Sequence, residues 1–175
     1  ALTTIGGALN TSGWNDGGVI QTPNQPAFLV RYTSSVGLVT GGAQTYPLVF
    51  PSEIFNVGGC ISAGVFTYPA TAPSGRVLFD ALVTLTDVAS VHNFAYLLLI
   101  TSNRQYVYSF NPAAMTHSPT ATQFSARISA LADMDPGDTA YLALYAEGET
   151  PPNKTVGILG HATNMNTYFS GWIVP

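Results

Sequence analysis

Short runs of β-branched and aromatic residues recur along this chain at roughly ten-residue spacing, each bounded by Gly, Pro, Asn or Asp. Runs of this length are typical of β-strands, and no stretch has the periodicity of an amphipathic helix. About ten runs are present, the number expected of a two-sheet sandwich. The sequence therefore predicts an all-β protein of two antiparallel sheets, with strands near residues 28–34, 46–50, 65–68, 76–86, 94–101, 105–110, 124–131, 139–146, 156–160 and 167–174.

Residues 1–25 differ in composition from the rest of the chain. They are rich in Gly, Thr and Asn, and their main apolar side chains are Trp14 and Ile20. Gly-rich segments of this kind lack a regular pattern. We interpret residues 1–25 as an extended N-terminal arm and residues 26–175 as one domain, large enough to bury a core without disulfides or metals.

Charge is scarce in this sequence. Only 8% of residues are charged and 46% are hydrophobic, whereas an ordinary domain carries about 25% charged residues. The net charge is -4 with Lys154 as the single lysine, so no basic patch is available to neutralise phosphates. We expect neither nucleic acid nor an anionic membrane as a partner, and the weakly charged surface favours burial against other subunits.

The first residues also show neither a signal peptide nor a membrane span, and an alanine at position 1 fits removal of an initiator methionine in the cytosol.

Several predicted strands carry large apolar residues on both faces. In the run 76–85, Val77 and Phe79 begin one apolar face, yet Leu78 and Leu82 lie on the other. Burying such side chains between subunits gains roughly 1.5 to 3 kcal/mol each, which for several residues exceeds about 10 kcal/mol before entropic costs. We therefore predict an obligate oligomer; cover by an intrachain loop or by the arm remains the alternative. The predicted interface residues are Leu78, Leu82, Tyr96, Leu98, Tyr141, Tyr145 and Tyr168.

A series of motifs in the domain resembles a known family. In chain order they are Tyr46–Phe50, Asn56–Gly59, Gly64–Ala70, Gly75–Phe79, Pro136–Asp138 and Tyr168–Val174, with Pro26–Phe28 at the start of the first strand. Their order and spacing resemble the globular head of C1q, which has an F, then N-x-G-G, then G-x-F-T-x-P, a Gly before an aromatic strand, a late Gly-Asp turn and a closing F-S-G-aromatic strand. The resemblance covers about residues 26–175.

The resemblance implies a ten-stranded jelly roll of the tumour-necrosis-factor type, packed as a homotrimer about a threefold axis. Two features depart from a secreted, multivalent member of that family: the sequence has no collagen-like Gly-X-Y stem, and Cys60 is its only cysteine. A single cysteine excludes an intrachain disulfide, and we expect Cys60 to be a buried apolar residue. A bare trimeric head is the expected form.

The sequence does not favour an enzyme. His92, His117 and His161 are far apart, and no Gly-x-Ser-x-Gly elbow or motif-like carboxylate pair is present. Four glycines at predicted strand ends are expected to adopt positive φ in turns, because a residue without a Cβ does so at little cost: Gly58, Gly59, Gly64 and Gly75. No Gly-rich loop here opens a helix that could bind phosphate. We expect no cofactor.

Asp133, Asp135 and Asp138 place three carboxylates within six residues. Carboxylate oxygens are preferred calcium ligands, so a weak structural calcium site is one interpretation. The other is ordinary turn chemistry, because Pro136-Gly137 precedes an apolar strand and Leu144 occupies the position of the bidentate EF-hand glutamate.

Two functions remain open. The first is a structural module of a virion surface, such as a phage capsid decoration protein, whose partner is a shell protein and whose arm 1–25 anchors it. The second is an extracellular, secreted recognition head, or a viral fibre head, that binds carbohydrate or protein through loops such as 111–122 and 147–154. Asn10 and Asn153 lie in N-x-S/T motifs, which favour the secreted form if glycosylated.

Overall fold

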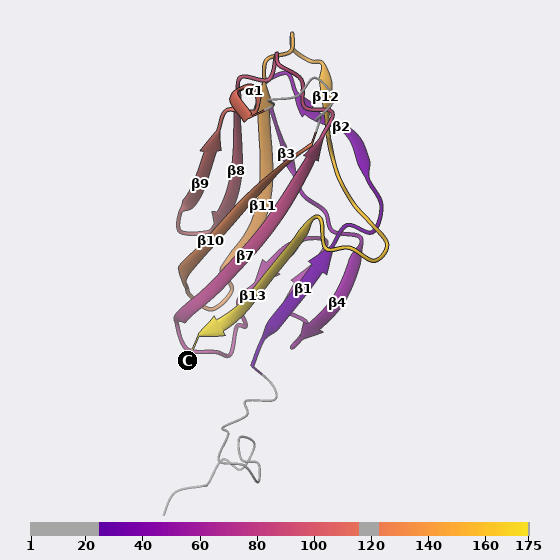
Figure 1. Cartoon of the computed structure of the whole chain (residues 1–175). Helices are drawn as coiled ribbons and strands as arrows, with labels where there is room; N and C mark the ends of the chain where they lie inside the picture. Colours follow the sequence, from indigo (N-terminus) through magenta and orange to yellow (C-terminus); the bar gives the residue numbers. More distant parts are fainter. Residues whose placement is uncertain (1–24, 116–122, 175) are drawn as a thin grey trace, which may run out of the picture.

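The computed structural model describes residues 25–115 and 123–174 and shows a sandwich of two antiparallel sheets (Figure 1). The first sheet, in spatial order, contains β2 (Val36–Gly41), β12 (Lys154–Ile158), β7 (Gly75–Thr86), β13 (Tyr168–Val174), β1 (Ala27–Arg31) and β4 (Ser52–Val57), with β10 (Phe124–Met134) paired to β7. The second contains β5 (Ile61–Ser62), β6 (Val65–Thr67), β11 (Thr139–Glu147), β8 (Phe94–Thr101) and β9 (Gln105–Phe110), with β3 (Gln44–Pro47) paired to β11. The predicted all-β sandwich is confirmed.

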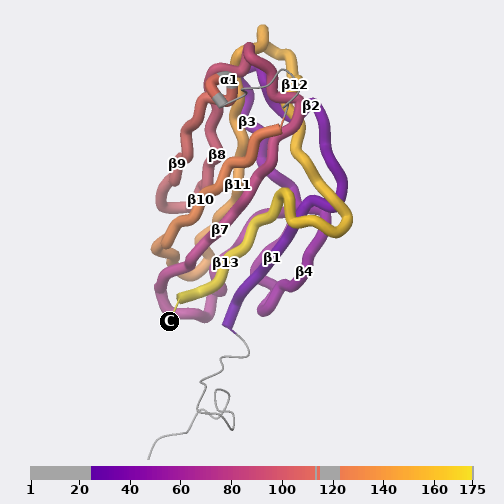
Figure 2. The backbone as a smooth tube through the Cα atoms, viewed as in Figure 1, coloured from indigo at the N-terminus to yellow at the C-terminus, as the bar shows by residue number. Residues whose placement is uncertain are grey.

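Strand β7 organises the first sheet. One of its edges pairs with all 11 residues of β10, from Leu85 opposite Phe124 to Gly75 opposite Met134. Its other edge pairs first with β13 and then, at Leu85 and Thr86, with β12. The backbone trace shows β10, β7, β13, β1 and β4 side by side (Figure 2). Residues at both ends of the domain thus meet in one sheet.

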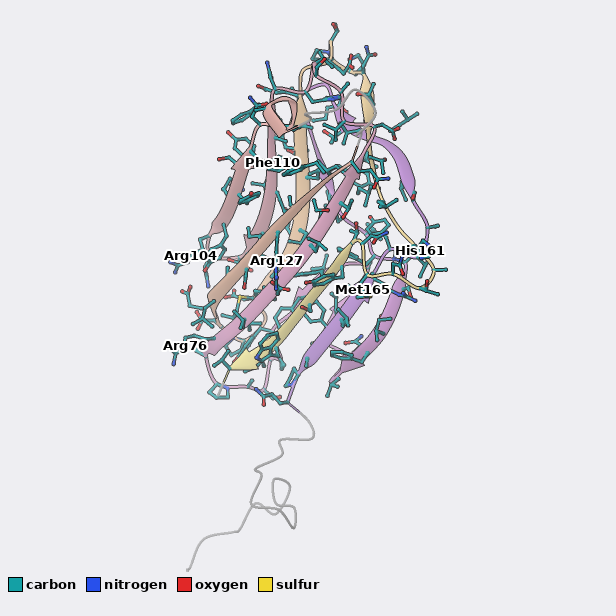
Figure 3. The ribbon with its side chains drawn as sticks, in the orientation of Figure 1. Arg76, Arg104, Phe110, Arg127, His161 and Met165 are labelled. Atoms are coloured by element: carbon teal, nitrogen blue, oxygen red, sulfur yellow. The ribbon has the colours of Figure 1, made fainter. Side chains whose placement is uncertain are left out.

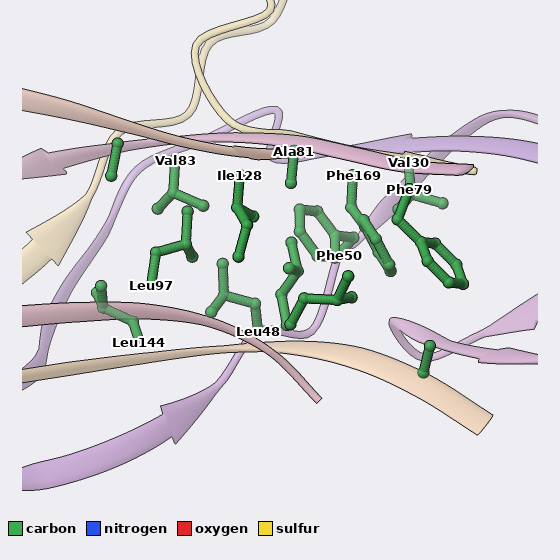
Figure 4. Close-up of a cluster of buried hydrophobic side chains, with 14 of the residues drawn as sticks. Val30, Leu48, Phe50, Phe79, Ala81, Val83, Leu97, Ile128, Leu144 and Phe169 are labelled. Carbon is green, nitrogen blue, oxygen red and sulfur yellow. The ribbon is translucent and has the colours of Figure 1, made fainter. Parts of the chain in front are cut away.

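The core lies between the two sheets. Val77, Phe79, Ala81, Val83 and Leu85 of β7 are at most 1% exposed, so the inward face predicted for this strand is confirmed. Their counterparts on the second sheet include the fully buried Leu97 and Leu144 (Figure 4). Leu142 on the same sheet is also fully buried. Alternation of buried and half-buried residues along both β7 and β8 follows from the two-residue period of a strand.

Phe28, Phe66, Phe79 and Phe169 form an aromatic cluster in this core, with ring centroids as close as 4.9 Å between Phe28 and Phe169. Gly171 of β13 lies opposite both Phe28 and Phe79. A Cβ at position 171 would lie 2.7 Å from Phe28 Cε1 and 2.8 Å from Phe79 Cδ1. The glycine of the closing F-S-G-aromatic motif is therefore needed to make room for the cluster.

The structure differs from the predicted strands in several places. It contains β2, β4 and β5, which were not predicted, and a four-residue helix, α1 (Pro112–Met115). The register of β4 against β1 shifts between Leu29 and Val30, which interrupts the alternation of the β4 residues. The predicted positive φ at Gly75 is wrong. That glycine instead allows close packing, because a Cβ there would lie 2.7 Å from the Tyr68 hydroxyl.

Candidate binding and assembly faces

The predicted interface residues fall into two groups on opposite sides of the sandwich. Leu78, Leu82 and Tyr168 point outward from the first sheet, and Tyr96, Leu98, Tyr141 and Tyr145 point outward from the second; all seven are half-buried. We call the outer surface of β10, β7, β13, β1 and β4 the first-sheet face, and that of β3, β11, β8 and β9 the second-sheet face. The structure therefore separates residues that sequence reasoning treated as one interface.

A row of apolar residues crosses the first-sheet face. It consists of one residue from each of five neighbouring strands, and each residue lies directly opposite the next: Leu131, Leu78, Trp172, Ala27 and Val57. Directly opposed residues point to the same side of an antiparallel sheet, so these side chains form one continuous apolar row. Leu131 is 48% and Trp172 42% exposed. Contiguous exposed apolar surface of this kind marks interaction sites.

The apolar row extends at the β4 edge, where the exposed Phe55 lies opposite Leu29. Sequence reasoning identified Leu78 but missed Leu131, Trp172 and Phe55. Leu131 occupies an otherwise polar outward face of β10, and the pattern of β4 is broken by its irregular register. Only the cross-strand pairing brings these residues together.

A polar cluster centred on Asp80 adjoins the apolar row. Arg127 donates from Nε to Asp80 Oδ1 at 3.0 Å and from Nη2 to Asp80 Oδ2 at 3.2 Å. The Tyr168 hydroxyl also donates to Asp80 Oδ2, at 2.8 Å. The side chain of Asp80 is 15% exposed, whereas that of Arg127 is 66% exposed. Arg127 lies on β10, next to β7 (Figure 3). The pKa of Tyr168 is raised, mainly by burial and secondly by the hydrogen bond to Asp80. The Tyr168 hydroxyl therefore remains a donor. The Asp80 charge is thus satisfied within one subunit.

Arg31 continues this polar region, because it lies opposite Tyr168 on β1. Its Nε atom is buried and has no hydrogen-bond partner among residues 25–115 and 123–174. A buried guanidinium donor without a partner costs free energy.

The second-sheet face carries an aromatic pair above a hollow. Tyr96 of β8 lies opposite Tyr145 of β11, with ring centroids 5.6 Å apart and planes inclined at 40°. The Tyr145 hydroxyl donates to Glu147 Oε2 at 2.8 Å, which raises the pKa of Tyr145. Beside the rings is an open hollow of about 450 Å³ lined by Thr45, Tyr96, Leu98, Gln105, Val107 and Tyr145.

The acidic cluster Asp133, Asp135 and Asp138 forms a turn. The Asp138 carboxylate accepts from the Asp135 backbone N–H at 2.9 Å and from Asn103 Nδ2 at 2.8 Å, while Asp133 pairs with Arg104 at 2.6 Å. Gly137 has φ of 89°, as a turn with Pro before Gly requires. Within the described part of the chain, no group of three His, Cys, Asp or Glu side chains is arranged to hold a metal ion. These contacts support the turn interpretation of the three aspartates, and calcium binding at this turn stays a prediction.

The remaining candidate residues have local structural roles. His92 is fully buried; its Nδ1 accepts from the Ala89 N–H at 2.9 Å, and its Nε2 bonds Thr155 Oγ1 at 2.8 Å. His161 is exposed, and its Nδ1 accepts the backbone N–H of Thr163 at 3.1 Å. Cys60 is buried as predicted, which raises the pKa of its thiol to about 11.

Some predicted features lie outside the described residues. These are the arm up to residue 24, Asn10, His117 and the loop segment 116–122. The loop 147–154 is described, and Asn153 is exposed in it. Among the residues that the structure covers, no helix has the length and apolarity needed to span a membrane.

Comparisons with known proteins identify the fold. No protein-family model and no curated protein matches the sequence. Among solved structures, the globular domain of zebrafish complement 1qA protein is similar with a TM-score of 0.58 and 15% identity, covering 86% of this chain and 98% of that one. Murine APRIL is similar with a TM-score of 0.54 and 8% identity, covering 86% and 99%. Together with the two-sheet topology, these similarities show that the chain has the jelly-roll fold of the C1q globular domain and the tumour-necrosis-factor family.

Proposed function

We propose that this chain is a non-enzymatic homotrimeric module of a virion surface, of the kind that decorates a phage capsid. Assembly into an oligomer is supported mainly by the apolar row across the first-sheet face, centred on Leu78 and Trp172. The C1q and APRIL likeness supports a trimeric binding module as its general class.

Burial of the first-sheet face against another subunit is energetically reasonable. Each large apolar side chain removed from water there contributes about 1.5 to 3 kcal/mol. The Asp80 carboxylate already has Arg127 and Tyr168 as partners, so covering this face does not leave that carboxylate unpaired. Closed threefold symmetry requires the face to meet a different surface of the next subunit.

The amino-acid composition supports the proposed virion location. A chain with 8% charged residues and one lysine is suited to close packing on a protein shell and poorly suited to binding nucleic acid. The arm, residues 1–25, is the segment we assign to the shell protein. The trimer would then sit where shell subunits meet.

Deletion of residues 1–20 tests the location. The truncated chain should keep the mass of the intact oligomer but lose attachment to virions purified on a density gradient, whereas the full chain should be recovered with them. Unchanged attachment would refute the anchoring role of the arm. Glycans on Asn10 or Asn153 in native material would contradict a virion protein folded in the cytosol and support the secreted recognition head.

A further inference from the structure

The hollow on the second-sheet face is built from three kinds of side chain. Tyr96 and Tyr145 supply aromatic rings, Leu98 and Val107 supply an aliphatic surface, and two neutral polar groups, Thr45 and Gln105, complete the lining. Its volume of about 450 Å³ falls within the range of sites for small ligands, roughly 300 to 1,000 Å³. An apolar floor with a few neutral polar groups is the usual composition of such sites.

The aromatic rings are held in position by contacts on the same face. The Tyr145 ring is fixed at its hydroxyl by the 2.8 Å hydrogen bond to Glu147. The edge of Phe94 packs against Tyr96 with centroids 4.4 Å apart and planes at 82°. Rings that are already ordered lose little conformational entropy when a ligand stacks on them.

The charges around the hollow disfavour an anionic ligand. None of its six lining side chains is ionic. The carboxylate of Glu147 accepts the Tyr145 hydroxyl, and Arg104, next to Gln105 in the chain, is ion-paired with Asp133 at 2.6 Å. An anionic ligand would therefore find no free cation in the lining, and a purely apolar ligand would leave Thr45 and Gln105 without partners.

The face of a pyranose ring matches this lining. In β-linked hexoses with equatorial substituents, axial C–H groups form a flat apolar face, and their slight positive charge is attracted to the electron-rich face of an aromatic ring. Ring hydroxyls point outward from the edge of the sugar, where the Thr45 hydroxyl and the Gln105 amide can exchange hydrogen bonds with them.

We propose that this hollow binds a short neutral oligosaccharide of β-linked hexoses, stacked on Tyr96 and Tyr145. The site is on the side of the sandwich opposite to the apolar row of Leu78 and Trp172. It therefore requires only that assembly leave the second-sheet face free, and it does not depend on the virion location.

Binding of cellotriose and N,N′,N″-triacetylchitotriose to the full-length protein tests the proposal. We expect saturable binding of at least one of them by NMR titration, with shift changes centred on Tyr96, Tyr145 and Gln105. Tyr96→Ala and Tyr145→Ala should each weaken binding at least tenfold, whereas Tyr96→Phe, which keeps the ring, should weaken it less. Tyr141→Ala is the matched control, because Tyr141 is half-buried on the same face but does not line the hollow.

Three results would overturn the proposal. The first is the absence of saturable binding of both trisaccharides up to about 10 mM, beyond the millimolar affinities of the weakest specific sites. The second is binding whose shift changes map away from the hollow in the wild-type protein, a measurement that does not depend on any variant folding. The third is dissociation of the native oligomer by Tyr96→Ala or Tyr145→Ala, which would make this face a subunit interface.

Discussion

Leu78 and Trp172 lie directly opposite each other on β7 and β13, and both side chains point away from the core. The next pair along the ladder, Phe79 and Gly171, points inward to the aromatic cluster. The same two strands thus build the core with one set of residues and an apolar outer face with the other. This arrangement connects the fold of the subunit to its proposed assembly.

Trp172→Asp is expected to dissociate the oligomer. A carboxylate in the middle of the apolar row would lose its hydration on assembly without gaining a partner. Light scattering should give the 18.4 kDa mass of a single chain, and circular dichroism should show an intact β-fold. Val91→Asp is the control, because Val91 has the same exposed fraction of 42% but lies outside the first-sheet face. A Trp172→Asp protein that keeps the native mass would contradict the assigned interface.

The Asp80 cluster is expected to stabilise the subunit mainly through Tyr168. A half-buried hydrogen bond to a charged group contributes about 1.5 to 3 kcal/mol, whereas exposed ion pairs contribute little. In urea unfolding of the Trp172→Asp monomer, Asp80→Ala should lower the free energy of unfolding by about 1 to 3 kcal/mol. Arg127→Ala should lower it by less, because the Arg127 side chain is 66% exposed. Equal losses for the two variants would show that the ion pair dominates.

Gly171→Ala is expected to destabilise the fold. The added Cβ would lie 2.7 and 2.8 Å from the rings of Phe28 and Phe79, so the aromatic cluster must shift. Overpacking of this kind costs about 1 to 3 kcal/mol. Gly37→Ala serves as the matched strand control, because no atom lies within 4 Å of its added Cβ. In urea unfolding at one protein concentration, Gly171→Ala should have a lower free energy of unfolding than Gly37→Ala. Equal free energies of unfolding would contradict the packing role of Gly171.

Sequence periodicity predicted much of this fold because the alternation within a strand is a local property. The inward residues of β7 were correctly assigned to one apolar face. The separation of Leu78 from Tyr145 onto opposite faces depends on which strands share a sheet, and no local pattern contains that information. For the same reason, the Asp80 cluster was missed: its members come from three strands that are distant in the sequence.

Cys60 is expected to be unreactive in the folded protein. Burial raises the pKa of its thiol from 9.0 to about 11, so little reactive thiolate forms at pH 8. Its contribution to stability is fully present below about pH 9 and is lost as the pH rises through about 11, because the unfolded chain releases the proton first. A thiol reagent should label Cys60 slowly at pH 8 and rapidly in urea. Equally fast labelling with and without urea would contradict its burial.

The mass of the purified full-length chain in solution, measured by light scattering over a range of protein concentrations, tests the central claim most directly. The account predicts three times 18.4 kDa, about 55 kDa. The mass should not change on calcium chelation, because the Asp133 and Asp138 carboxylates pair with Arg104 and with the turn. A stable monomer of 18.4 kDa at every concentration would contradict assembly through the apolar row of Leu78 and Trp172.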